Sequence, residues 1–308
     1  MSSYNQSQLD QLNTTVSTTA ILGLIGSLAV VLMFFLGPKK SKSNYSRQCI
    51  MMVCAMELLP NIGRLLGPES FRDKSSCNVQ GAFVLTEVSE AIWNIAHTTN
   101  ILLRVVYKWK EVEANKFRIP FFILSLILPI FGVSFALGRD SISNSSGAWC
   151  NTTDLGVLFG AKHAWIILSM VYSFVITIWV IIFIIRERME LHYQRSELKV
   201  KIGAQQAGLK QLLYVVAFFI SIPYSTIKRL INLSQKTPFE ATLVQALVVP
   251  MQGFWCMWIY AYLEGHLSRG VEKVQNKMLR KDSGNDKRLA LGTGALITPA
   301  WYDTEQYV

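Results

Sequence analysis

The sequence predicts an all-α membrane protein, a seven-transmembrane helix bundle with a C-terminal amphipathic membrane-surface helix. Its 308 residues are 51% hydrophobic and only 16% charged, whereas a soluble domain carries about 25% charged residues. Seven mostly apolar runs reach the length of roughly 20 residues that a helix needs to cross a bilayer. The chain does not open with a basic stretch, a short apolar core and a small-residue cleavage site. The first run is therefore expected to act as a signal anchor.

The expected organisation is an outer N-terminal segment (1–14), the bundle (15–263), an amphipathic cytoplasmic helix (264–280) and a disordered tail (281–308). The seven expected spans are Thr15–Gly37, Gln48–Leu66, Cys77–Tyr107, Ile119–Leu137, Ala161–Ile185, Leu209–Ile231 and Ala241–Leu263. They share no repeating unit, which disfavours a transporter assembled from internal repeats.

The third expected span, Cys77–Tyr107, is apolar enough to cross a membrane but carries many polar groups. These are Glu87, Glu90, Asn94, His97, Asn100 and Arg104. Because ionisable groups are costly in lipid, they usually face a protein interior. This helix is therefore expected at the centre of the bundle.

The distribution of basic residues predicts the orientation in the plasma membrane. Of the 30 lysines and arginines, 21 fall in three inter-span loops and the segment after the last span. The positive-inside rule then puts the N-terminus outside and the C-terminus in the cytoplasm. Five glycosylation sequons lie on the predicted outer side, which makes a glycoprotein the expectation. They are Asn5, Asn13, Asn144, Asn151 and Asn232.

Two of the five cysteines fall on the predicted oxidising side, Cys77 at the outer end of the third span and Cys150 in the loop after the fourth. They are expected to form a disulfide that holds this loop over the bundle. The three others lie within spans, where reduced cysteines serve as packing residues.

The segment 264–280 alternates Leu267, Val271, Val274 and Met278 with arginines and lysines. This pattern is typical of a basic amphipathic helix that lies on anionic membrane lipids. The net charge of +10 is thus explained by membrane topology, and no nucleic-acid partner is expected. The loop Arg186–Lys210 is either a solvated charged face or a docking surface for a cytoplasmic partner.

Ionisable residues near the outer half of the expected bundle are the candidate ligand-binding set. They are Arg64, Glu87, Glu90, Lys162, His163, Lys228 and Arg229. Basic side chains meeting at the bundle mouth would suit an anionic small molecule. Alternatively, Lys228 and Arg229 reach the lipid headgroups, and one of the two glutamates is protonated or forms a structural ion pair with Arg64.

A second candidate set concerns activation and coupling. Asn94 and His97 are expected either to make satisfied interior hydrogen bonds or to join a polar activation network with Glu57. Gln252 is expected to bridge helices. Pro223 and Gly253 are candidate kinks. Arg104 and Tyr107 stand at the cytoplasmic edge of the third span, where Arg104 either anchors at the membrane surface or contacts a cytoplasmic partner.

Four short motifs in order resemble those of cyclic-AMP-receptor-like G-protein-coupled receptors, a family that includes amoebal chemoattractant receptors and fungal nutrient-sensing receptors. The motifs are Cys77-Asn78-Val79-Gln80-Gly81 followed by Trp93, Gly147-Ala148-Trp149-Cys150, Gln252-Gly253-Phe254-Trp255 followed by Tyr260, and Met56-Glu57-Leu58-Leu59. The resemblance implies a receptor without a cofactor that binds an extracellular small molecule and activates a heterotrimeric G protein. A homodimer is left open.

The chain departs from the family pattern at three places. Cys256 and Asn151 stand where the family more commonly has Asn and Trp, and Tyr214-Val215 stands where Tyr-Pro is usual. These departures bear on the ligand and on activation more than on the architecture.

Other seven-span functions fit the sequence less well. A retinal-binding pump needs a lysine in the last span for a Schiff base, and Ala241–Leu263 contains none. A zinc-dependent intramembrane hydrolase needs about three converging ligands, and only His97 of the four histidines lies deep in a span. No enzymatic activity is expected, and a small-solute transporter remains the alternative.

Overall fold

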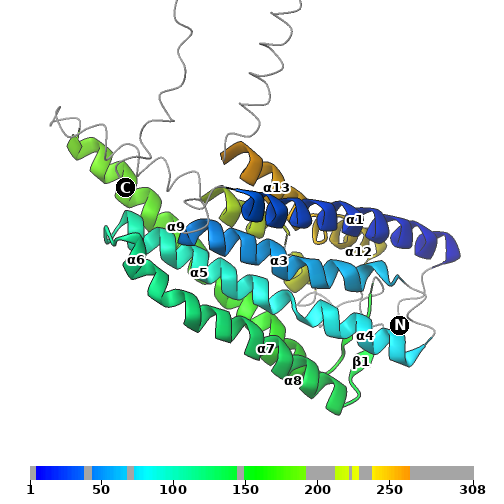
Figure 1. Cartoon of the computed structure of the whole chain (residues 1–308). Coiled ribbons are helices and arrows are strands. Elements are labelled where there is room, and N and C mark those ends of the chain that lie inside the picture. The colour runs from blue at the N-terminus through cyan, green and yellow to red at the C-terminus, as the bar shows by residue number, and fades with distance from the viewer. Residues whose placement is uncertain are drawn as a thin grey trace, which may run out of the picture.

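The computed structural model describes residues 5–37, 44–67, 73–143, 149–191, 212–221, 224–228 and 238–263, and these are almost entirely helical (Figure 1). The main helices are α1 (Gln6–Leu36), α3 (Tyr45–Leu65), α4 (Lys74–Leu85), α5 (Glu87–Val105), α7 (Arg118–Gly138), α9 (Ala164–Leu191), α12 (Phe239–Val248) and α13 (Gln252–Leu263). Shorter pieces are α6 (Glu111–Ala114), η2 (Asn115–Phe117), α8 (Leu155–Val157) and the π-helical turn η3 (Leu158–His163). Residues 212–221 and 224–228 are also helical.

Helix α5 lies at the centre of the bundle, as the sequence predicts. It packs against α3, α7 and α9, and 15 of its 19 residues are buried. A helix that is buried on all sides can carry polar groups only where other helices supply partners. This position explains why the polar residues of the third expected span occur here.

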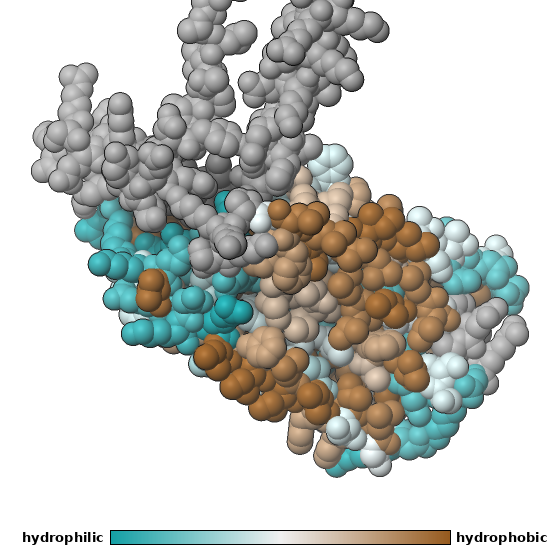
Figure 2. All heavy atoms as spheres, viewed as in Figure 1, coloured by the Kyte–Doolittle hydropathy of each residue, from teal (hydrophilic) through white to brown (hydrophobic). Residues whose placement is uncertain are grey.

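An apolar belt covers the middle of the molecule, and both ends are polar (Figure 2). Large apolar side chains such as Ile25 of α1, Ile130 of α7 and Ile182 of α9 are more than half exposed on its surface. Among the described residues, four helical stretches are long and apolar enough to cross a membrane: Gln6–Leu36, Glu111–Gly138, Leu158–Glu187 and Phe239–Tyr262. The belt and these helices indicate an all-α membrane protein, and the full set of seven spans stays a prediction.

Helix α1 begins earlier than expected, so the N-terminal segment is partly helical. Asn5 caps the helix by accepting a hydrogen bond from the backbone N–H of Gln8 at 2.8 Å, and the Gln8 side-chain oxygen accepts one from the Asn5 backbone N–H at 3.1 Å. This capping box fixes the start of the helix. At 1.5 Å per residue the helix is about 46 Å long, well over the roughly 30 Å hydrocarbon core.

The third expected span is two helices rather than one. Helix α4 ends at Leu85 and α5 begins at Glu87. The hydroxyl of Thr86 donates to the carbonyl of Phe83 at 2.6 Å. Such side-chain bonds to the preceding turn compete with the helical ladder. Glu87 consequently lies in the first turn of α5, where the helix dipole favours a carboxylate.

The last expected span is also divided, between α12 and α13 at Val249–Met251. Pro250 lacks a backbone N–H and cannot continue the helical ladder. The break therefore lies just before Gly253, the residue expected to form the kink. Gly253 instead allows α13 to approach α1: a Cβ on Gly253 would meet Ser27 Oγ at 2.0 Å and the Gly23 carbonyl oxygen at 2.4 Å.

A two-stranded antiparallel ribbon of β1 (Ile142–Ser143) and β2 (Asn151–Thr152) was not expected. It brings the chain back to α4 and places Trp149 and Cys150 against the bundle.

Several expectations fall outside the described residues. These are Asn144, Arg229, Asn232, Pro223, most of the loop 186–210, the amphipathic helix 264–280 and the tail 281–308.

Candidate functional site

Five buried ionisable residues meet between α3, α5 and η3, and we call them the ion cluster: Glu57, Arg64, Glu87, Glu90 and Lys162. Arg64 is 1% exposed, and its guanidinium donates to Glu87 and, at 2.6 Å, to Asn61 Oδ1. Asn61 in turn donates to Glu57 Oε1 at 2.9 Å. Glu57, Asn61 and Arg64 share one face of α3 because they are spaced four and three residues apart.

Glu87 forms ion pairs with two cations, Arg64 and Lys162. Its second oxygen lies 2.7 Å from Lys162 Nζ, which also donates to the Val84 carbonyl at 3.3 Å. Arg64 Nη1 additionally lies 3.6 Å from Glu57 Oε1. The structural ion pair between Arg64 and one of the two glutamates, raised as an alternative by the sequence, is therefore present in the structure. Lys162 joins it from η3.

Glu90 stands one turn beyond Glu87 on the same face of α5. Its side chain is fully buried, and in the described part of the chain neither carboxyl oxygen accepts a hydrogen bond from a donor group. Glu57 and Glu87 act on it as like charges, and Arg64 acts as the opposite charge. The ion cluster thus holds three carboxyl groups against two basic side chains.

A loop held by the predicted disulfide closes one end of the ion cluster. Cys77 and Cys150 are bonded, with their Cα atoms 5.5 Å apart, which confirms the expected pairing. The oxygen of the Gln80 amide accepts from the Cys150 backbone N–H at 2.7 Å, and its nitrogen donates to the Gly63 carbonyl at 3.1 Å. The buried Trp149 ring lies 5.2 Å from Arg64 Cζ, within the range of a cation–π contact.

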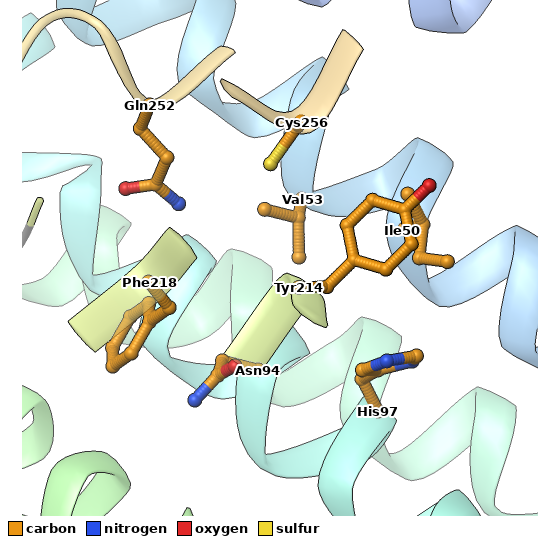
Figure 3. Close-up of a pocket in the computed structure, with 8 residues that line it drawn as sticks. All are labelled: Ile50, Val53, Asn94, His97, Tyr214, Phe218, Gln252 and Cys256. Carbon is orange, nitrogen blue, oxygen red and sulfur yellow. The ribbon is translucent and has the colours of Figure 1, made fainter. Parts of the chain in front are cut away.

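A second polar feature, which we call the Gln252 cavity, lies between α3, α5, α13 and the helical residues 212–221 (Figure 3). Its lining residues are Ile50, Val53, Asn94, His97, Tyr214, Phe218, Gln252 and Cys256. About 10 Å³ of it is accessible to water, which is room for roughly one water molecule. Within the described residues, neither end of the Gln252 amide has a hydrogen-bond partner, although the side chain is 1% exposed.

The expected network of Glu57 with Asn94 and His97 is arranged differently. Glu57 belongs to the ion cluster, whereas Asn94 donates to Ser169 and Ser173 of α9 at 3.1 and 2.8 Å. The His97 ring packs edge-on against Tyr214, 5.9 Å between centroids. Asn94 and His97 therefore line the Gln252 cavity, and they tie α5 to α9 and to the helix of residues 212–221.

Two further residues of the expected ligand set are buried between helices. His163 Nδ1 lies 3.0 Å from the Thr226 hydroxyl, and Lys228 donates to Gln245 Oε1 at 2.8 Å. Lys228 is only 4% exposed, so it does not reach out to the membrane surface. That interpretation of Lys228 is wrong, because Gln245 of α12 holds its ammonium inside the bundle.

At the opposite end of α5, Arg104 is half-buried in the last turn. Tyr107 is 52% exposed, and its ring lies 6.5 Å from that of Trp179 of α9. The neighbouring Lys108 forms an ion pair with Glu187 at 2.7 Å. This end therefore joins α5 to α9, and it presents an aromatic and basic surface.

Two of the described sequons are open to solvent and one is not. Asn5 and Asn13 are exposed. Asn151 is 4% exposed, and its amide oxygen accepts from the Thr152 backbone N–H at 2.9 Å. A glycan cannot be attached to a buried side chain, so the structure argues against Asn151 as an acceptor.

Comparison with known proteins shows a distant similarity to a receptor-like protein. No family model matches the chain. The chain is 23% identical over 281 residues to a protein of Dictyostelium discoideum named cyclic AMP receptor-like protein A. The alignment covers 90% of this chain and 71% of that protein. The long apolar helices indicate a membrane protein, and the protein that it resembles is named receptor-like.

Sequence reasoning missed three residues that organise the site, namely Asn61, Gln80 and Trp149. Asn61 and Gln80 could have been found as polar residues inside otherwise apolar spans, the signal used for α5. Gln80 and Trp149 also stand in two of the motifs that carry the family resemblance, but the contact of Trp149 with Arg64 depends on the loop conformation.

Proposed function

We propose that the protein is a plasma-membrane G-protein-coupled receptor of the cyclic-AMP-receptor-like type. The observation that carries the proposal is the similarity to a named receptor-like protein over 90% of the chain. The buried ion cluster beneath a disulfide-held loop supports it, because ionisable groups inside a membrane bundle are functional by default. The distribution of basic residues supports a topology with the N-terminus outside and the Cys77 end facing out.

The proposed ligand is a small extracellular molecule, with an anion preferred. The basic residues proposed to bind it are Arg64, Lys162, His163, Lys228 and Arg229. Since Glu87 already neutralises Arg64 and Lys162, an anionic ligand must compete with Glu87 for them. Binding would then separate the helices that Glu87 holds together, which is the differential contact that shifts a two-state equilibrium.

The proposed coupling surface is the Arg104 end of α5, together with the basic loops and the amphipathic segment 264–280. Arg104 and Tyr107 are proposed to contact the heterotrimeric G protein. The mechanism requires only different affinities of the G protein for two arrangements of the helices. No bond is made or broken in the receptor.

Guanine-nucleotide exchange on co-expressed heterotrimers, in membranes that contain the protein, tests the proposal. The wild type should raise exchange above that of empty membranes, and Arg104→Ala should alter it. Lys74→Ala is a suitable control, because Lys74 lies at the opposite end and is 65% exposed. Equal effects of the two substitutions would contradict coupling at Arg104.

The alternative is a seven-span transporter of a small solute. Absence of exchange with every heterotrimer, with or without candidate anions, together with saturable solute uptake by the same membranes, would replace the receptor proposal by this one.

A further inference from the structure

We propose that Glu90 is a neutral carboxylic acid in the arrangement described here, and that the ion cluster binds one proton, which Glu90 shares with Glu57. The proton comes from water and adds one positive charge to the cluster. The inference deepens the proposed function, because it makes the proton a second ligand of the receptor. The site itself exists independently of G-protein coupling.

The first argument is the balance of charge. Glu57 and Arg64 come from α3, Glu87 and Glu90 from α5, and Lys162 from η3. Each is 2% exposed or less. If all five were ionised, the cluster would carry one net negative charge inside an apolar bundle. One bound proton makes it neutral.

The second argument is the distribution of hydrogen-bond donors, which shows where the proton lies. Glu87 forms ion pairs with Arg64 and Lys162. Glu57 accepts a hydrogen bond from Asn61, and its Oε1 lies 3.6 Å from Arg64 Nη1. Both oxygens of Glu90 lack a donor within the described residues. An ionised carboxylate buried without donors is far more costly than a neutral acid, so the proton goes to Glu90.

The surroundings of Glu90 leave few other ways to neutralise it. Glu57 is its strongest charged neighbour, and two carboxyl groups that share one buried site do not both ionise. The thiol of Cys54 also lies near both glutamates. His163, which acts on Glu87, is bonded to Thr226 across the bundle. No three His, Cys, Asp or Glu side chains in the described ranges form a site for a metal ion.

A neutral Glu90 is also a hydrogen-bond donor, which an ionised one is not. Glu57 of α3 is the acceptor across the α3–α5 interface. The shared proton would therefore hold these two helices together. Any ligand that draws Arg64 or Lys162 away from Glu87 would change the affinity for this proton, and by reciprocity pH would change the affinity for the ligand.

Infrared spectroscopy of the purified full chain in lipid discs tests the proton site without any G protein. The wild type at neutral pH should show the carbonyl stretch of a protonated carboxylic acid in a dry environment. Glu90→Gln should remove this band, and Glu240→Gln, which changes an exposed glutamate, should leave it. A wild-type spectrum without the band, or a band that persists in Glu90→Gln, would overturn the proposal.

A second variant keeps the test decisive if Glu90→Gln does not fold. Glu57→Gln removes one carboxylate, so Glu87 and Glu90 together balance Arg64 and Lys162 without a bound proton. The band should therefore be lost, and a band unchanged from the wild type would contradict the shared proton. The functional readout is the pH dependence of nucleotide exchange, which should be present in the wild type and lost in Glu90→Gln. A protonated-acid band in a protein that supports no exchange would leave the proton site standing and refute the receptor proposal instead.

Discussion

The substitution Glu87→Gln should destabilise the protein strongly, because the Glu87 carboxylate forms ion pairs with two buried cations. Arg64 and Lys162 are 1% and 2% exposed, and both form ion pairs with Glu87. Removing one partner of a buried ion pair costs about 3–5 kcal/mol, because the other charge stays buried. For a chain of this size, this corresponds to a melting temperature lower by about 6–20 °C.

The buried thiols of Cys49, Cys54 and Cys256 provide an internal reporter of unfolding. A thiol-reactive fluorogenic dye added during a temperature ramp labels them only as the bundle opens. Glu90→Gln is the matched control, because it makes the same chemical change one turn away on α5. The control should melt close to the wild type, since an amide replaces a neutral acid. Equal melting temperatures for Glu87→Gln and the wild type would refute the assignment of Glu87 as the shared counter-ion.

Three further outcomes can be measured. Gly253→Ala should lower the melting temperature through a loss of about 1–3 kcal/mol from overpacking against α1, whereas Gly138→Ala, with no atom within 4 Å of its new Cβ, should not. The hydrogen bond from Arg139 holds the pKa of Asp154 below its usual range. The ion pair therefore stabilises the loop at pH values above the ordinary pKa range of Asp. This stabilisation is lost as the pH falls through the folded-state pKa of Asp154. The effect of Arg139→Ala on protease resistance of the loop should disappear at low pH. Finally, Asn151→Gln should leave the pattern of glycoforms on a gel unchanged, because this side chain is buried; a lost glycan would contradict it.

The sequence predicts the central helix and the disulfide correctly because both follow from simple physical constraints. Polar groups in an apolar span must face other protein, and α5 is accordingly buried on nearly all sides. Cys77 and Cys150 were the two cysteines expected on an oxidising side. In both cases the relevant chemistry is carried by the residues themselves.

The sequence does not predict where the helices are interrupted, because a long apolar run looks the same whether it forms one helix or two. At the division between α4 and α5, the Thr86 hydroxyl donates a hydrogen bond to the Phe83 carbonyl. The π-helical turn Leu158–His163 widens the helix by one residue per turn. A widened turn changes which direction a side chain points, so the approach of Lys162 to Glu87 could not be deduced from 3.6-residue periodicity. Residues in regular α5 were easier to place than those in η3 for this reason.

The interruption before α13 connects the ion cluster with the Gln252 cavity. Pro250 ends the ladder of α12, and its carbonyl oxygen accepts a hydrogen bond from Asn61 Nδ2 at 3.3 Å. The same Asn61 bonds Glu57 and Arg64. Gln252 follows two residues later, at the edge of a cavity with room for about one water molecule. A shift of Arg64 on ligand binding would therefore act through Asn61 on the position where α12 ends and α13 begins. At Gly253 the backbone of α13 packs directly against α1, so α13 has no room to move toward α1. A displacement of α13 would therefore be directed toward the Gln252 cavity, next to α5.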